Sequence, residues 1–307
     1  MTTDEVCAMP QIDVLSGAPR RLQRSGVRMP RWLSRALLYL GVLAFLAIIL
    51  LPFYWILLSS ITPKFKMFSI PPRYWPDEIT FENYAKMAQT IPFTRYFGNS
   101  LVFAFGSSVV SVALAFLASY GLARVRFRGS NLVFMGFLIS IAVPQVGTLV
   151  PLFEMFRIFH LINKPIGLIT LMSSLLVPFT VWILVSFVQQ VPVEIEEAAS
   201  IDGARLPQIL WYVVVPVVKP ALATMMIINF IISWNELLYP LVFATDRLTK
   251  TLSVGLVELA VDPSMGAGRP WDLMSALSVT MIIPVLILVL GFQRLIISGL
   301  TRGAIKG

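Results

Sequence analysis

The sequence predicts an all-α membrane protein, a polytopic bundle of six transmembrane helices with one further short helix in a cytoplasmic loop. Hydrophobic residues make up 57% of the 307 residues and charged residues only 13%, whereas a soluble domain carries about 25% charged residues. Six long apolar stretches follow one another, and none alternates in hydrophobicity as the strands of a membrane barrel do. So few charges can cover a bundle in lipid but cannot cover a globule in water.

Five of the six apolar stretches are long enough to cross a bilayer, since a helical span needs about 20 apolar residues. The fifth is short, and it reaches this length only if its helix starts before Pro220 or continues past Asn235 towards Leu241. No stretch contains Lys, Arg, Asp or Glu, which argues against a proton-coupled carrier because intramembrane charges mark proton relays. The expected spans are Ala36–Ser60, Leu101–Ala123, Asn131–Phe153, Ile166–Val188, Ala221–Asn235 and Leu273–Phe292.

Arginines predict the orientation of the bundle, because basic residues gather in cytoplasmic loops. The polar tail, residues 1–35, contains six arginines, and the short loop Arg124–Arg128 contains three more. We therefore expect both termini in the cytoplasm, with residues 1–35 as a tail and residues 36–307 as the six-span domain. The first apolar stretch is too long for a cleaved secretory signal. The tail could also contact anionic membrane lipid.

Several classes of protein are disfavoured by composition. Cys7 and His160 are the only cysteine and histidine, so the chain can build neither an internal disulfide nor an ordinary zinc site. The net charge of +8 comes from basic residues between apolar segments, which indicates membrane topology and no nucleic-acid partner. We find no catalytic constellation and no metal site, so an enzyme is not expected.

The second predicted span carries small residues at every fourth position: Ser107, Ser111, Ala115 and Ser119. On a helix these residues lie on one face and allow another helix to approach closely. We expect ordinary close packing at this face; the alternative is a surface along which a helix slides.

The sequence of the loop between the fourth and fifth spans predicts a short helix with a start signal and a stop signal of its own. Pro192 suits a helix start and Gly203 suits the position just after a helix end. Glu194, Glu196 and Glu197 fall in the first turns, where the helix dipole favours negative charge. Two readings stay open: a solvated linker, or a helix that docks into the groove of a partner. The face that would dock consists of Ile195, Ala198, Ala199 and Asp202.

The same loop resembles a known signature. Glu197-Ala198-Ala199 is followed after three residues by Gly203, and after nine more by Val213-Val214-Val215-Pro216. This pattern resembles the EAA motif of ATP-binding-cassette importer permeases, with valines in place of the usual isoleucine and leucine. The stretches Tyr120–Gly129 and Trp234-Asn235-Glu236 are similar to the maltose-type, carbohydrate-importing branch of that family. The resemblance runs from about residue 36 to the end.

The resemblance implies a permease of a bacterial inner membrane that moves a sugar or sugar derivative inward. The loop 191–220 would hold the coupling helix, which contacts a separate ATPase subunit that binds ATP and Mg²⁺. The segment Leu252–Pro270 would face an extracytoplasmic substrate-binding protein, and a second permease and two ATPase subunits would complete the assembly. The implied ATPase contacts are Glu197, Ala198, Ala199, Asp202, Gly203 and Pro216, together with Ile305, Lys306 and Gly307.

One feature of the sequence supports the implied separate ATPase subunit. The chain contains no Gly-Lys dipeptide and so lacks a phosphate-binding loop of the usual form. If it pumps, the energy must come from another chain. The competing hypothesis is a self-sufficient, ion-coupled secondary carrier that binds its ion through carbonyls and hydroxyls.

Three side chains on the fifth span are candidates for the substrate path. Asn229 and Asn235 offer amides that match sugar hydroxyls, and Trp234 offers a ring for stacking. The alternatives are that Asn229 bonds a neighbouring helix and that Trp234 anchors at the membrane interface. The second permease could also hold the substrate by itself.

Overall fold

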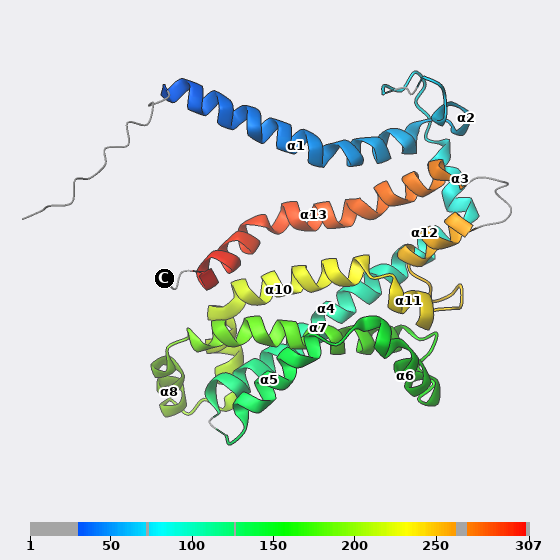
Figure 1. Cartoon of the computed structure of the whole chain (residues 1–307). Helices are drawn as coiled ribbons and strands as arrows, with labels where there is room; N and C mark the ends of the chain where they lie inside the picture. Colours follow the sequence, from blue (N-terminus) through cyan, green and yellow to red (C-terminus); the bar gives the residue numbers. More distant parts are fainter. Residues whose placement is uncertain (1–29, 72–73, 126, 262–268, 305–307) are drawn as a thin grey trace, which may run out of the picture. The chain divides into compact units, whose positions relative to one another are not determined.

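The computed structural model describes residues 30–71, 74–125, 127–261 and 269–304. It divides into two compact units, Met1–Leu51 and Pro52–Gly307, and in the described ranges all regular elements are helices (Figure 1). Five of the described helices are long and apolar enough to cross a membrane. They are α1 (Arg31–Ile61), α4 (Phe93–Arg124), α7 (Pro165–Gln189), the continuous run Leu206–Asn235, and α13 (Trp271–Ala304). The prediction of an all-α membrane bundle is confirmed.

The third predicted span, Asn131–Phe153, is not one straight helix. It consists of α5 (Ser130–Ile141) and α6 (Gln145–Ile158), whose axes differ in direction by 102°. Pro144 explains the break, because proline has no N–H to donate and restricts the residue before it to extended backbone. The backbone of Pro144 is itself extended, with φ −63° and ψ 125°.

The fifth span reaches membrane length by starting early, as one of the two alternatives predicted. α9 (Leu206–Ile209), the π-helix η1 (Leu210–Val214) and α10 (Val215–Asn235) form one continuous run. The other alternative, a helix that continues past Asn235 towards Leu241, is wrong, because the backbone of Glu236 is extended, with ψ 127°. The carboxylate of Glu236 instead accepts the backbone N–H of Leu238, at 2.8 Å, and starts a separate short helix.

The remaining helices are short and lie at the two ends of the second unit. In Figure 1, α8 lies at one end, whereas α3, α11 and α12 lie at the other. This arrangement matches a bundle whose connecting helices sit on opposite sides of a membrane. The short helices are α2 (Lys64–Met67), α3 (Glu82–Thr90), α8 (Val193–Ile201), α11 (Leu238–Phe243) and α12 (Leu252–Val261).

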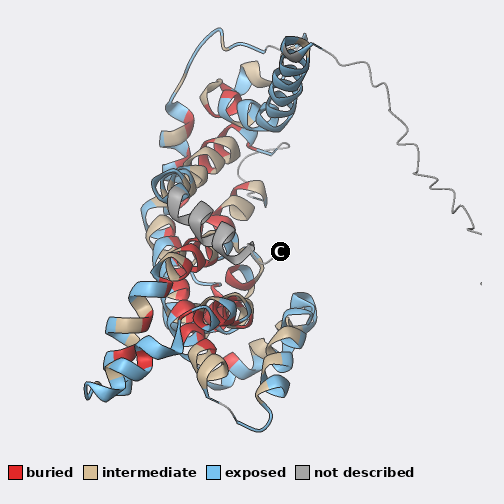
Figure 2. Ribbon diagram, turned by 90° about the vertical axis from the view of Figure 1, so that its left-hand side faces the viewer, coloured by how far each residue is buried: buried red, intermediate tan, exposed pale blue. Residues whose placement is uncertain are grey.

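The core of the second unit forms where α4 packs along α7, the most extensive helix contact of the unit. The four small residues predicted on one face of α4 are all fully buried. The hydroxyl of Ser173 on α7 donates to the backbone carbonyl of Ser107 at 3.3 Å, which shows how closely the two helices approach. Figure 2 shows buried residues on the inward sides of the helices and exposed residues on the outward sides. The expected close packing is confirmed.

A buried amide joins α10 to this helix pair. Asn229 is fully buried, and its Nδ2 donates to the Oγ of Ser111 at 2.8 Å and to the Oγ1 of Thr180 at 2.9 Å. Ser111 lies on α4 and Thr180 on α7, so one side chain connects three helices. In an apolar interior such hydrogen bonds fix which faces of the helices meet.

We therefore expect Asn229→Ala to destabilise the protein by about 1–3 kcal/mol, since it removes two interhelical hydrogen bonds and leaves a small cavity. Thermal unfolding of the purified protein in detergent would measure this loss. Asn235→Ala is the matched control, because among the described residues the Asn235 amide bonds only the Ile231 carbonyl of its own helix, at 2.8 Å. Equal unfolding midpoints for the two variants would contradict this account.

Candidate functional site

The predicted short helix is present as α8 (Val193–Ile201). Pro192 stands directly before its first residue, with φ −59° and ψ 131°, and so fixes where the helix begins. Glu194 and Glu196 fall in the first turn, where a carboxylate interacts favourably with the unpaired N–H groups and the helix dipole. The start of α8 therefore depends on proline geometry and acidic side chains, as the sequence predicted.

The end of α8 is formed by a glycine in left-handed conformation. Gly203 has φ +86°, its N–H bonds the carbonyl of Ser200 at 3.1 Å, and the N–H of Ala204 bonds the carbonyl of Ala199 at 3.0 Å. These two bonds are the Schellman arrangement, which satisfies the last carbonyls of a helix. A Cβ on Gly203 would meet no atom within 4 Å, so the backbone conformation, and not space, requires glycine.

The motif residues of α8 are mostly accessible. Glu197, Ala198, Asp202 and Gly203 are exposed, and Ala199 is half-buried. Pro216, the last motif position, is also exposed and lies in the first turn of α10. The structure thus leaves these side chains available for contact with another protein, whereas their role in such a contact stays a prediction.

Glu196, expected only as one of the acids in the first turns, is the buried acid of α8. Its side chain is 9% exposed, and its Oε1 lies 2.7 Å from Nη2 and 2.9 Å from Nε of Arg124. Its Oε2 accepts the hydroxyl of Tyr120 at 2.9 Å. Both carboxylate oxygens are therefore satisfied from the last turns of α4.

Arg124 makes further bonds with the end of α7. Its Nη2 donates to the carbonyl of Val188 at 3.0 Å and to the carbonyl of Val191 at 2.6 Å. Carbonyls at a helix end have no partner within the helix, so the guanidinium satisfies α7 while it pairs with α8. We call this set of contacts the Arg124–Glu196 network: Arg124, Glu196, Tyr120 and the carbonyls of Val188 and Val191.

One sequence signal could have identified the network. Tyr120 and Arg124 are four residues apart on α4, and residues at this spacing lie on the same helix face. Two polar side chains on one face at the end of an apolar span imply a polar partner. The partner itself lies 72 positions further along the chain, and no local pattern predicts that pairing.

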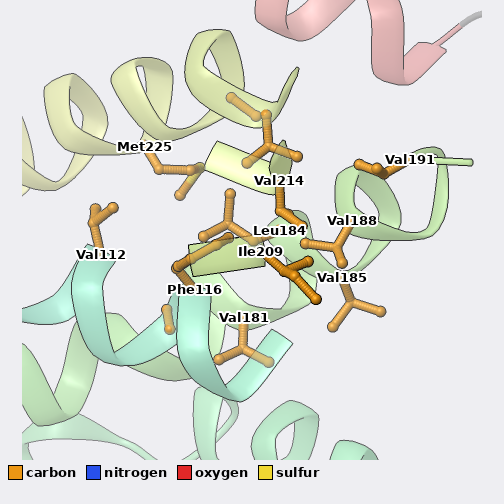
Figure 3. Close-up of a cluster of buried hydrophobic side chains, with 13 residues drawn as sticks. Val112, Phe116, Val181, Leu184, Val185, Val188, Val191, Ile209, Val214 and Met225 are labelled. Atoms are coloured by element: carbon orange, nitrogen blue, oxygen red, sulfur yellow. The ribbon is translucent and has the colours of Figure 1, made fainter. Parts of the chain in front are cut away.

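Near α8, a buried apolar cluster joins the ends of the membrane helices. Figure 3 shows its side chains converging from α4, α7, α9, η1 and α10. Ala199 of α8 packs against this cluster. The end of the bundle that carries α8 is therefore well packed. The labelled members are Val112, Phe116, Val181, Leu184, Val185, Val188, Val191, Ile209, Val214 and Met225.

The three candidate substrate-path residues do not converge on one surface. Asn229 is buried between helices, as the structural alternative expected. Trp234 is 2% exposed, stacks on Phe230 with ring centroids 5.7 Å apart, and donates its Nε1–H to the carbonyl of Met281 at 3.0 Å. Only Asn235 is exposed. A substrate path along this face stays a prediction.

At the opposite end of the unit, Glu258 of α12 pairs with Lys250, just before the helix, and bonds Tyr96 of α4. Glu258 lies 2.5 Å from the Nζ of Lys250 and accepts the hydroxyl of Tyr96 at 2.8 Å.

The segment expected to face a binding protein, Leu252–Pro270, begins with α12, and residues 262–268 lie outside the described residues. Ile305, Lys306 and Gly307 also lie outside them. In the described ranges, no three His, Cys, Asp or Glu side chains are placed to hold a metal ion.

Comparison with known proteins finds relatives that this chain matches over most of their length. The chain is 34% identical over 279 residues to the inner membrane ABC transporter permease protein YcjP of Escherichia coli (strain K12), covering 90% of this chain and 98% of the relative. It is 32% identical over 277 residues to the trehalose/maltose transport system permease protein MalG of Thermococcus litoralis, with the same coverage. It is 32% identical over 256 residues to the diacetylchitobiose uptake system permease protein DasC of Streptomyces coelicolor, covering 83% and 91%.

The fold is shared with a chain from the crystal structure of a bacterial ABC transporter involved in the import of the acidic polysaccharide alginate. The TM-score is 0.74 at 23% identity, over 87% of this chain and 98% of that chain. Residues 24–302 match the family model described as binding-protein-dependent transport system inner membrane component. The resemblance drawn from the EAA motif is thereby confirmed, and the chain belongs to the family of binding-protein-dependent transport system inner membrane components.

Proposed function

We propose that this chain is one of two permease subunits of an ATP-driven importer that carries a sugar or sugar derivative into the cell by alternating access. Membership of the family is the observation that carries the proposal. The relatives named for trehalose and maltose and for diacetylchitobiose support the substrate class. Nothing in these similarities favours the ion-coupled secondary carrier considered from the sequence.

The proposed power source is a pair of separate ATPase subunits, which bind ATP and Mg²⁺ and contact this chain through α8. Two observations support this contact. The sequence has no usual phosphate-binding loop, and α8 presents the exposed acids Glu197 and Asp202 beside the small residue Ala198. A helix with a small, acidic outer face suits a groove on a partner, where the small side chain allows close approach and the acids meet basic groups.

Alternating access then follows from two discrete arrangements of the bundle. When the ATPase subunits close, they displace α8, and the displacement shifts the membrane helices from an inward-open to an outward-open state. A second permease forms the other half of the translocation path, and an extracytoplasmic binding protein delivers the substrate to the end that carries α11 and α12. Residues Ile305 to Gly307 are proposed to reach the ATPase subunits as well.

Glu197→Lys and Gly203→Val test the proposed contact. We expect each to reduce ATP-dependent uptake by roughly 5–150-fold, the range of typical coupling free energies. Lysine reverses an exposed charge at the contact, and valine cannot adopt the positive φ of Gly203 without strain. Uptake of radiolabelled trehalose, maltose and diacetylchitobiose by membrane vesicles would measure the effect, with co-purification of the ATPase as a second readout.

Glu82→Lys is the matched control for the charge reversal, because Glu82 is an exposed acid on α3 whose side chain is 64% exposed. It lies at the opposite end of the second unit from α8, so the amount of ATPase that co-purifies should stay at the wild-type level. The coupling role of α8 would be refuted if Glu197→Lys and Gly203→Val both transported normally and still bound the ATPase.

The proposed topology, with both termini in the cytoplasm, can be tested through Cys7, the sole cysteine of the chain. A membrane-impermeant maleimide should label Cys7 in inverted vesicles and leave it unlabelled in right-side-out vesicles, because basic tails stay on the cytoplasmic side. The double variant Cys7→Ser/Ile79→Cys should show the reverse pattern, since Ile79 is 59% exposed and lies in a loop proposed to face outward. Labelling of Cys7 in right-side-out vesicles would overturn the topology.

A further inference from the structure

We propose that the Arg124–Glu196 network holds α8 rigidly to α4 and α7, so that a displacement of α8 is passed directly to both membrane helices. This inference rests on the proposed function, because it takes the displacement to come from an ATPase subunit. It makes Glu196 a positioning residue, which acts through Arg124 and does not itself contact the ATPase.

Two adjacent acids of α8 have opposite environments. Glu196 is buried with its side chain 9% exposed, whereas Glu197 is exposed. Successive residues of an α-helix point about 100° apart, so one acid faces the bundle while its neighbour faces outward. Glu196, directly before the motif, therefore supplies a contact to the bundle, whereas Glu197, the first residue of the motif, is free to face a partner.

Glu196 is the buried contact of α8 with the rest of the chain. Among the nine residues of α8, all of which the structure describes, it is the only buried one. Ala199 adds apolar packing from a half-buried position. A force on the outer face of α8 therefore reaches α4 through one buried carboxylate, beside the contacts that α8 makes with α9 and η1.

The geometry of the network restricts rotation and sliding of α8. Arg124 donates Nε–H to the Glu196 carboxylate, and its Nη2 forms the ion pair with the same carboxylate oxygen while donating to the carbonyls of Val188 and Val191. A guanidinium is planar with its donors in fixed directions, so these partners together define its position. α8 cannot move relative to α4 and α7 without breaking several charge-assisted hydrogen bonds at once.

Burial makes the network stiff. Hydrogen bonds to charged groups strengthen where solvent is excluded, and the side chain of Arg124 is 13% exposed. Separating the pair would leave a buried charge without a partner, which is strongly unfavourable. A partly opened network is therefore poorly populated, and α8 moves together with its two helices.

The proposal predicts that the distance between α8 and α4 stays constant while the transporter changes state. Spin labels at Ile201 and Phe105, both exposed on their helices at 87% and 60%, report this distance in a Cys7→Ser background. The experiment uses the whole complex in lipid nanodiscs, with and without Mg²⁺ and a non-hydrolysable ATP analogue. We expect one narrow distance distribution in both conditions for the otherwise wild-type chain.

Glu196→Ala should broaden this distribution, and the nucleotide analogue should shift its mean. Glu196→Gln and Arg124→Lys should give intermediate effects, because each preserves part of the hydrogen bonding. Transport per ATP hydrolysed should fall about 5–150-fold in Glu196→Ala, while the amount of bound ATPase stays near the wild-type level. Glu154→Ala is the control, since it removes an Arg–Glu pair that is exposed and lies within one helix, with Arg157 as its partner.

The outcomes separate the two proposals. If no ATPase co-purifies with the wild-type chain, the proposed function fails and the inference fails with it. If the ATPase binds and Glu196→Ala keeps a narrow, nucleotide-independent distance, the network does not transmit motion and only the inference fails. Should Glu196→Ala accumulate poorly, Glu196→Gln and Arg124→Lys give the same test, and wild-type distances in both would overturn the inference.

Discussion

The close approach of α4 and α7 is the contact on which the rest of the second unit depends. It is possible because the facing residues of α4, among them Ser107 and Ser111, are small enough for two backbones to come together. α10 is then placed by the amide of Asn229, which needs hydroxyls from both helices at once. The ends of the same two helices supply the guanidinium and the carbonyls that hold α8. Each later element thus depends on surfaces that exist only once this pair has formed.

The α8 segment combines local and long-range constraints in nine residues. Its beginning and end depend on Pro192 and Gly203, which act through backbone geometry and need no partner. Its position on the bundle depends on Glu196, which needs Arg124. The same helix can therefore form in many surroundings, whereas its ion pair with α4 requires one distant side chain.

Much of this architecture could be predicted from sequence, because its causes are local. Apolar length predicts the spans, and Pro192 and Gly203 predict the limits of α8. The break at Pro144 was missed since the apolar run continues through it, although proline itself was the available signal. The pairing of Glu196 with Arg124 could not be predicted, because it depends on how α4 and α7 align in space. Asn229 was a candidate for two roles, and only its hydroxyl partners on other helices favour the structural one.

The break in the third span has a consequence for the surroundings of the chain. α5 contains 12 residues and so is about 18 Å long, well short of the roughly 30 Å of hydrocarbon in a bilayer. Residues 141 to 147, at the turn, are exposed on this chain. Acyl chains cannot solvate the carbonyls of such a turn. Beside this turn we therefore expect water or protein, and not acyl chains, within the depth of the bilayer.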